Sequence, residues 1–136
     1  MKDFIVLMAI LPLLLLFMLQ FGTDYRNNER IEAIQNIVYT AKETAKQEGC
    51  FSDELKTEIT EKISKKLKIP EESITITTSE GKRTRYGTEK DIEYCVSVKL
   101  DNVMAGGSMM GISNEENTMV YVIDSYTASE YLGDSY

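Results

Sequence analysis

The most prominent feature of the hydrophobicity pattern is an apolar run from Phe4 to Phe21, near the start of the chain. No charged or hydrogen-bonding side chain interrupts this run before Gln20. As a helix it would be about 27 Å long, at the short end of what a bilayer core of about 30 Å requires. The other residues offer too little apolar surface to enclose it, so the pattern favours membrane insertion over burial in a core. A small-residue cleavage site does not follow the run, so we expect it to be retained.

Beyond residue 22 the apolar positions narrow to a seam with spacings of three and four residues. Its members are Ile31, Ile34, Val38, Ala41 and Ala45. This spacing is typical of a helix that packs along one face. We therefore expect one continuous helix from Asp3 to Glu48, with Gly49 at its C-terminal end. Inside it, Pro12 removes the hydrogen bond to the carbonyl of Met8, which predicts a kink or a loosened turn there.

The pattern after residue 50 predicts a small α+β head. Ser52 or Asp53 can cap a second helix, which Pro70 ends. Its apolar stripe recurs at every fourth position: Leu55, Ile59, Ile63 and Leu67. Alternation with a period of two then predicts strands over residues 73–78, 92–100 and 118–127, with a long charged hairpin loop over residues 79–89. The third strand is apolar on both faces, so we expect it to be central in the sheet or covered.

The expected fold class is therefore α+β. A long helix, hydrophobic in its first part and amphipathic in its second, would carry a small globular head at its C-terminal end, which gives a lollipop-like fold. The head would contain one short helix on a three-stranded antiparallel sheet. One such domain is all that 136 residues permit beyond the apolar run.

Charge and composition exclude several functions. The net charge is −7, and the one basic cluster, residues 82–85, is too short for a nucleic-acid surface. The chain has no histidine, and its carboxylates are not paired with a nucleophile, so we expect no enzyme and no cofactor. Residues 114–117 lack the alternating spacing of a calcium loop, which favours a solvated acidic turn over a metal site.

The two cysteines, Cys50 and Cys95, allow two interpretations. If the head lies outside the cytoplasm, an oxidising compartment favours a disulfide between them. Two unpaired thiols are the alternative. Because Cys95 lies on the polar side of its strand, pairing would require it to meet Cys50 at a sheet edge or under the turn that follows the long helix.

Residues 103–112 are apolar but rich in glycine, and too broken for a regular strand or helix. Methionine side chains adapt to irregular partners. The segment is therefore either a loop folded back on the sheet or a contact surface between subunits. The candidate contact residues are Met104, Met109, Met110 and Ile112.

The apolar run contains the stretch Leu11-Pro12-Leu13-Leu14-Leu15. This stretch, the amphipathic continuation and the α+β head together resemble type IV pilins and pseudopilins, most closely the tight-adherence (TadE-like) pilins. The resemblance implies a structural subunit, major or minor, of a surface filament. It also implies three parts: a transmembrane and filament-core segment (1–22), the amphipathic continuation of the same helix (23–49) and a head outside the cytoplasm (50–136).

The resemblance implies a filament core formed by the first turns of the helix. The assembly residues would be Met1, Asp3, Phe4, Leu7, Met8, Leu11, Pro12 and Leu15. A carboxylate near the start of the run, usually Glu in this family, would neutralise the terminal amine of a neighbouring subunit; Asp3 is the candidate here. The family's short basic leader is not seen, so either Met1 is the processed N-terminus or the chain departs from the family.

The implied partners are copies of the same chain, membrane lipid before assembly, an assembly platform with its ATPase, and a prepilin peptidase. The subunit would wait in the cytoplasmic membrane as a single-pass protein with its head outside, and then join an extracellular filament. The alternative is a monomeric, membrane-anchored binding or accessory protein of a secretion or conjugation system. An unbroken helix from membrane to head favours the filament, because a mere anchor would tolerate a flexible linker.

Overall fold

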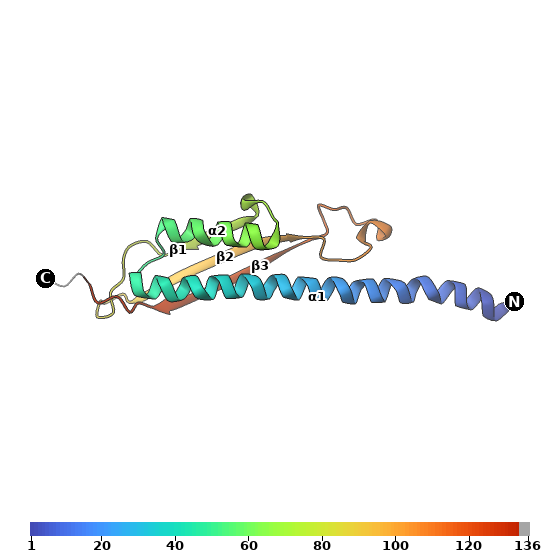
Figure 1. Cartoon of the computed structure of the whole chain (residues 1–136), viewed down its shortest axis with the longest axis horizontal. Coiled ribbons are helices and arrows are strands. Elements are labelled where there is room, and N and C mark those ends of the chain that lie inside the picture. Colours follow the sequence, from blue (N-terminus) through green and yellow to red (C-terminus); the bar gives the residue numbers. More distant parts are fainter. Residues whose placement is uncertain (134–136) are drawn as a thin grey trace. The chain divides into compact units, whose positions relative to one another are not determined.

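The computed structural model describes residues 1–133. Its helices are α1 (Lys2–Glu48) and α2 (Asp53–Leu67), and its strands are β1 (Ile74–Thr78), β2 (Asp91–Asp101) and β3 (Thr118–Ala128) (Figure 1). Two short 3₁₀ turns, η1 (Glu71–Ser73) and η2 (Gly107–Met110), lie between them. These elements confirm the predicted α+β class, with one long and one short helix and an antiparallel sheet of three strands among the described residues.

Helix α1 is continuous through both Pro12 and Gly22, as the pattern predicted. It ends where expected, because Gly49 adopts a positive φ of 82° and its N–H donates to the carbonyl of Ala45 at 2.8 Å. Such a left-handed C′ residue is most easily a glycine. The kink at Pro12 stays a prediction.

The chain forms two compact units. One combines residues 1–30 with residues 100–119, and the other combines residues 31–99 with the described residues from 120 onward. Each unit therefore contains a segment of α1. The domain boundaries predicted at residues 22 and 49 stay a prediction.

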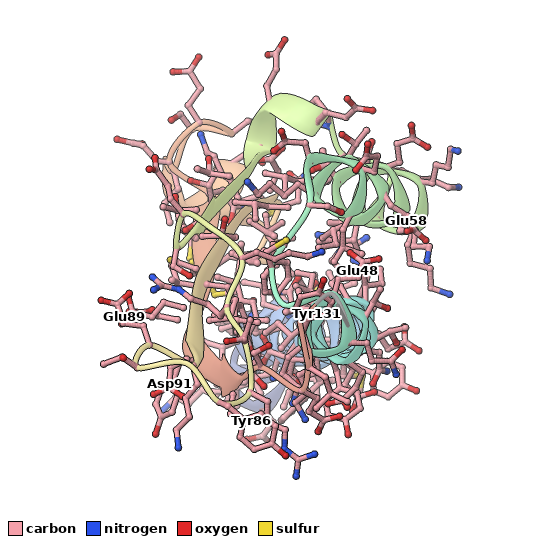
Figure 2. The ribbon with its side chains drawn as sticks, turned by 90° about the vertical axis from the view of Figure 1, so that its left-hand side faces the viewer. Glu48, Glu58, Tyr86, Glu89, Asp91 and Tyr131 are labelled. Carbon is pink, nitrogen blue, oxygen red and sulfur yellow. The ribbon has the colours of Figure 1, made fainter. Side chains whose placement is uncertain are left out.

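In the second unit, α2 and the C-terminal part of α1 cover the same face of the sheet (Figure 2). The strand order is β1-β2-β3, and β1 pairs with β2 in a register that places Ile74 opposite Val98 and Ile76 opposite Val96. Period-two alternation points every second side chain of β2 at the helices. The largest fully buried side chains of this unit are Ile34, Ile59, Ile63, Ile92, Val96 and Val98. Burial of each stabilises the fold by about 1.5–3 kcal/mol.

Helix α2 follows its sequence signals closely. The N–H of Leu55 donates to the Ser52 hydroxyl at 3.3 Å, which confirms the predicted N-cap. All four members of the apolar stripe are buried. The helix ends at Leu67, and Lys68 follows in the left-handed conformation with φ 56°, two residues before Pro70.

The prediction that the third strand is central or covered is wrong for the single chain. Strand β3 is at the edge of the sheet, and the side chains of Val120 and Val122 are 59% and 50% exposed. These valines point away from the helices, because the alternate residue Tyr121 accepts a hydrogen bond from Gln35 of α1 at 2.7 Å. The outer face of β3 is thus apolar but open.

The charged loop between β1 and β2 is held in place by hydrogen bonds to other parts of the second unit. The Arg83 N–H donates to the carbonyl of Gly49, and the Arg85 N–H to that of Tyr131, both at 2.7 Å. The Ser129 hydroxyl donates to the carbonyl of Arg83 at 2.7 Å. Figure 2 shows Tyr131 beside the C-terminal end of α1. These bonds anchor the loop and the segment after β3 to the end of the long helix.

Candidate functional site

The first part of α1 presents apolar side chains on all sides. It is the one helix among the described residues that is long and apolar enough to cross a membrane, and none of its most apolar stretch is buried. Side chains that are exposed all round and apolar are stable only against lipid or against other helices. The helix is therefore compatible with membrane anchoring.

The predicted assembly residues lie along this exposed part of α1. Met1, Phe4, Leu7, Met8, Leu11 and Leu15 are all exposed large hydrophobic residues. Asp3 lies in the first turn of the helix, where the helix dipole favours a negative charge. Among residues 1–20, Leu16 and Gln20 alone are partly covered. The role of the predicted assembly residues in a filament stays a prediction.

The seam residues lie further along the same helix. Ile34, Val38, Ala41 and Ala45 are buried, and Ile31 is half-buried. The seam is used within the single chain, where α1 packs under its own sheet. The seam side chains become smaller along the helix, from isoleucine to alanine. Small side chains at the C-terminal end allow the backbone of α1 to lie close to the elements packed against it.

The segment that leaves β2 lies along α1 in the first unit, held by three side chains of the helix. The guanidinium of Arg30 donates to the carbonyl of Asp101 at 3.0 Å. The side-chain amide of Asn27 donates to the carbonyl of Val103 at 2.9 Å. The Ala105 N–H donates to the side-chain carbonyl of Gln20 at 3.0 Å.

These three contacts define the methionine-rich loop, residues 102–117, as a built feature rather than a free connection. The next residue along, Gly106, approaches the apolar run itself. A Cβ atom at Gly106 would be 3.2 Å from Cδ2 of Leu16. The loop thus follows α1 from the level of Arg30 to that of Leu16, about 21 Å along the helix axis.

Two polar residues close the loop. The side chain of Asn117 is buried, accepts from the Met104 N–H at 2.8 Å and donates to the Met104 carbonyl at 3.0 Å. One carboxylate oxygen of Glu116 accepts from the Ser113 N–H at 3.1 Å and from the Ser113 hydroxyl at 3.0 Å. The hydrogen bond from the Ser113 backbone is the main reason that the pKa of Glu116 lies below its ordinary value.

The methionines of this loop differ in exposure from the residues that hold it. Met109 is 81% and Met110 59% exposed, and Met104 is also exposed. Ile112 is half-buried, and its N–H donates to the carbonyl of Gly107 at 2.9 Å. The loop therefore lies along α1, and it presents unbranched apolar side chains to the outside.

Sequence reasoning found the methionines but missed the residues that position them. In the sequence alone, these residues cannot be told from ordinary polar positions of a helix or a turn; they are Gln20, Asn27 and Asn117. Only the spacing Ser113-x-x-Glu116, which is that of a capping box, could have indicated local structure in the acidic turn.

The disulfide predicted between Cys50 and Cys95 is not formed, and both residues are free thiols, half-buried. The reason is the pleat of β2. The neighbouring Tyr94 packs against Phe51, with ring centroids 5.2 Å apart, so Tyr94 points at the helices and Cys95 points at the opposite face. Cys50 lies in the turn between α1 and α2, on the helix side of the sheet.

A groove of about 250 Å³ lies between α1 and α2 in the second unit. Its lining includes Thr40 and Thr44 from α1 and Glu58 and Lys62 from α2. The two charged groups form an ion pair at 2.5 Å, so they neutralise each other.

Comparisons with protein-family models, with curated proteins and with solved structures found no match to this chain.

Proposed function

We propose that this chain is a subunit of a type IV-like surface filament, either a major or a minor pilin. Before assembly it is held in the cytoplasmic membrane by the apolar part of α1, with its other parts outside the cytoplasm. During assembly the apolar helices leave the lipid and pack against one another. Copies of the same chain, an assembly platform with its ATPase and a prepilin peptidase are the partners of this process.

The observation that supports the proposal best is the continuity of α1. One helix is apolar on all sides over residues 4–19 and then continues without a break into a segment buried against the sheet. A bundle of such helices can replace lipid contact with helix contact. The exposed valines of β3 fit the same proposal, because an apolar strand at a sheet edge is a ready surface for a neighbouring copy.

Shearing the cells and imaging the released material by electron microscopy tests the proposal. We expect filaments whose main protein is this chain, identified by intact mass. A chain that stays entirely in the membrane fraction without any polymer would contradict the filament proposal and favour the monomeric, membrane-anchored binding protein.

A matched variant separates anchoring from assembly. In it, residues 4–19 are replaced by leucines, which preserve the length of the helix, its hydrophobicity and the bond from Gln20 to the methionine-rich loop but remove Pro12 and the specific side-chain shapes. We expect this variant to remain in the membrane fraction and to lose filaments, because assembly depends on packing between helices while anchoring depends on hydrophobicity alone.

A further inference from the structure

The tip of the methionine-rich loop, residues 104–112, combines three properties that the filament proposal does not use. It lies beside the apolar run, since Gly106 approaches Leu16. It is apolar and outward-facing, since Met109 and Met110 are largely exposed. It carries no charged side chain between Asp101 and Glu115.

The level of the tip along α1 can be compared with the depth of a bilayer. Leu16 is five residues before Phe21, the end of the apolar run, which corresponds to about 7.5 Å along the helix. Segments that lie in a membrane interface bury their apolar face about 5–10 Å into the boundary between headgroups and acyl chains. With Phe21 at that boundary, the tip of the loop is at a matching depth.

We propose that residues 104–112 form a membrane-contact loop, in which Met109 and Met110 insert among the lipids of the outer leaflet. This inference rests on the membrane-held state of the proposed function. The occupant is lipid because the loop surface is continuous with the exposed apolar surface of α1, which requires lipid in the same state. The contact is apolar rather than electrostatic, because the loop tip is uncharged and the chain as a whole is acidic.

The composition of the tip suits this contact. Methionine is unbranched and flexible, so it fills the irregular space between acyl chains without a fixed partner geometry. The backbone polar groups of the tip are partly paired within it: the Met109 N–H donates to the Gly106 carbonyl at 2.9 Å, and the Gly111 N–H to that of Ser108 at 3.3 Å. Such pairing lowers the cost of bringing the backbone close to lipid.

The chain has no tryptophan, so a single introduced tryptophan reports on one site. We suggest the full chain with Met109→Trp, reconstituted in phosphatidylcholine vesicles whose acyl chains carry bromine at a shallow or a deep position. Phe21→Trp is the control for a site at the membrane boundary. Tyr39→Trp, at an exposed position of α1 well beyond the apolar run, is the control for a site in water.

We expect shallow bromine to quench M109W to within about twofold of F21W, and Y39W to be unquenched, because both lipid sites lie within about 10 Å of the boundary. Equal weak quenching of M109W and Y39W would overturn the inference. A blue-shifted M109W emission without quenching would also overturn it, because the loop would then be covered by protein, such as a second copy. If F21W is unquenched, the membrane-held state is wrong and the inference fails with it.

A second readout guards against a variant that does not fold. A nitroxide attached to Met110→Cys, in a C50S/C95S background, should collide more often with oxygen than with a water-soluble nickel chelate. The opposite preference would overturn the inference. Quenching of M109W together with an absence of filaments would refute the filament proposal and leave the loop inference standing.

Discussion

Asn117 and Met104 form a reciprocal pair, in which one side-chain amide satisfies both the N–H and the carbonyl of the same backbone residue. Asn117 is buried, so water cannot replace these bonds easily. The pair closes the methionine-rich loop at its base and fixes where the tip begins.

Replacing Asn117 by alanine should therefore loosen the loop. Two backbone groups of Met104 would lose their partner, and because Met104 is itself exposed water can replace part of what is lost, so we expect a total cost of about 1 kcal/mol. Hydrogen–deuterium exchange should show faster exchange across residues 103–112 while α2 is unchanged. Asn114→Ala, at an exposed position of the same turn, is the control. Equal protection in both variants would show that the pair does not hold the loop.

The acidic turn predicts a pH dependence. The Ser113 N–H and hydroxyl lower the pKa of Glu116 below its ordinary value of 4.5. A carboxyl group whose pKa is lower in the folded state stabilises that state above the unfolded pKa, and this contribution is lost as the pH falls through the folded pKa. We expect the turn to be fully formed near neutral pH and to loosen only below about pH 4.5.

A carbon-detected NMR titration of Glu116 checks this prediction. In Ser113→Ala the side-chain donor is lost, so the pKa should move up towards its ordinary value while the backbone donor remains. A Glu116 pKa that is the same in both chains would mean that the hydroxyl does not contribute.

Gly22, inside α1, and Gly49, the residue after its end, should respond to alanine in opposite directions. At Gly49, φ is +82° and a Cβ atom would be 2.4 Å from the carbonyl oxygen of Arg83. Gly49→Ala should therefore lower the free energy of unfolding by at least about 1–3 kcal/mol. At Gly22 a Cβ atom meets nothing within 4 Å, so Gly22→Ala should stabilise the helix by about 0.5–1 kcal/mol. Thermal melts followed by circular dichroism measure both changes.

This account would be contradicted if G22A had a lower melting temperature than the native chain, or if G49A had the same melting temperature as the native chain. In the second case the loop at Arg83 would have to move aside without cost, which its hydrogen bond to Gly49 opposes.

The free cysteines make a prediction that mass spectrometry decides. Under non-reducing, denaturing conditions, both Cys50 and Cys95 should react with an alkylating agent, because they lie on opposite faces of the sheet. The double variant C50S/C95S should change the stability by less than about 1 kcal/mol. Loss of a native disulfide would instead cost about 2–5 kcal/mol. An intact mass two hydrogens below that of the reduced chain would contradict the structure.

Local patterns were sufficient to predict most of the fold. The stripe from Leu55 to Leu67 and the alternation along β2 each reflect burial on one face, which periodicity records directly. The roles of Gly49 and Ser52 at helix ends could be predicted, because helix ends have specific backbone and side-chain requirements. Positions of strands in the sheet are different, because they depend on pairing between distant segments. The outer valines of β3 indicated burial that the single chain does not provide.

The candidate site was only half predictable for the same reason. The apolar run and the methionines are visible as composition. The amides of Gln20 and Asn27 bind backbone groups 85 and 76 residues away, and no local pattern specifies which polar side chain meets which distant N–H or carbonyl. The loop between β1 and β2 is a similar case, since backbone bonds at Arg83 and Arg85 leave no trace in side-chain periodicity.

The contacts of the methionine-rich loop also determine how this protein should be produced for experiments. The usual way to obtain a water-soluble fragment is to delete the apolar segment, here through residue 22. That deletion removes Leu16 and Gln20, the two positions at which the helix contacts the loop nearest its tip. Asn27 and Arg30 would still hold its base. A soluble fragment would therefore keep the sheet and α2 and misrepresent the loop, so structures and binding assays need the full chain in detergent or lipid.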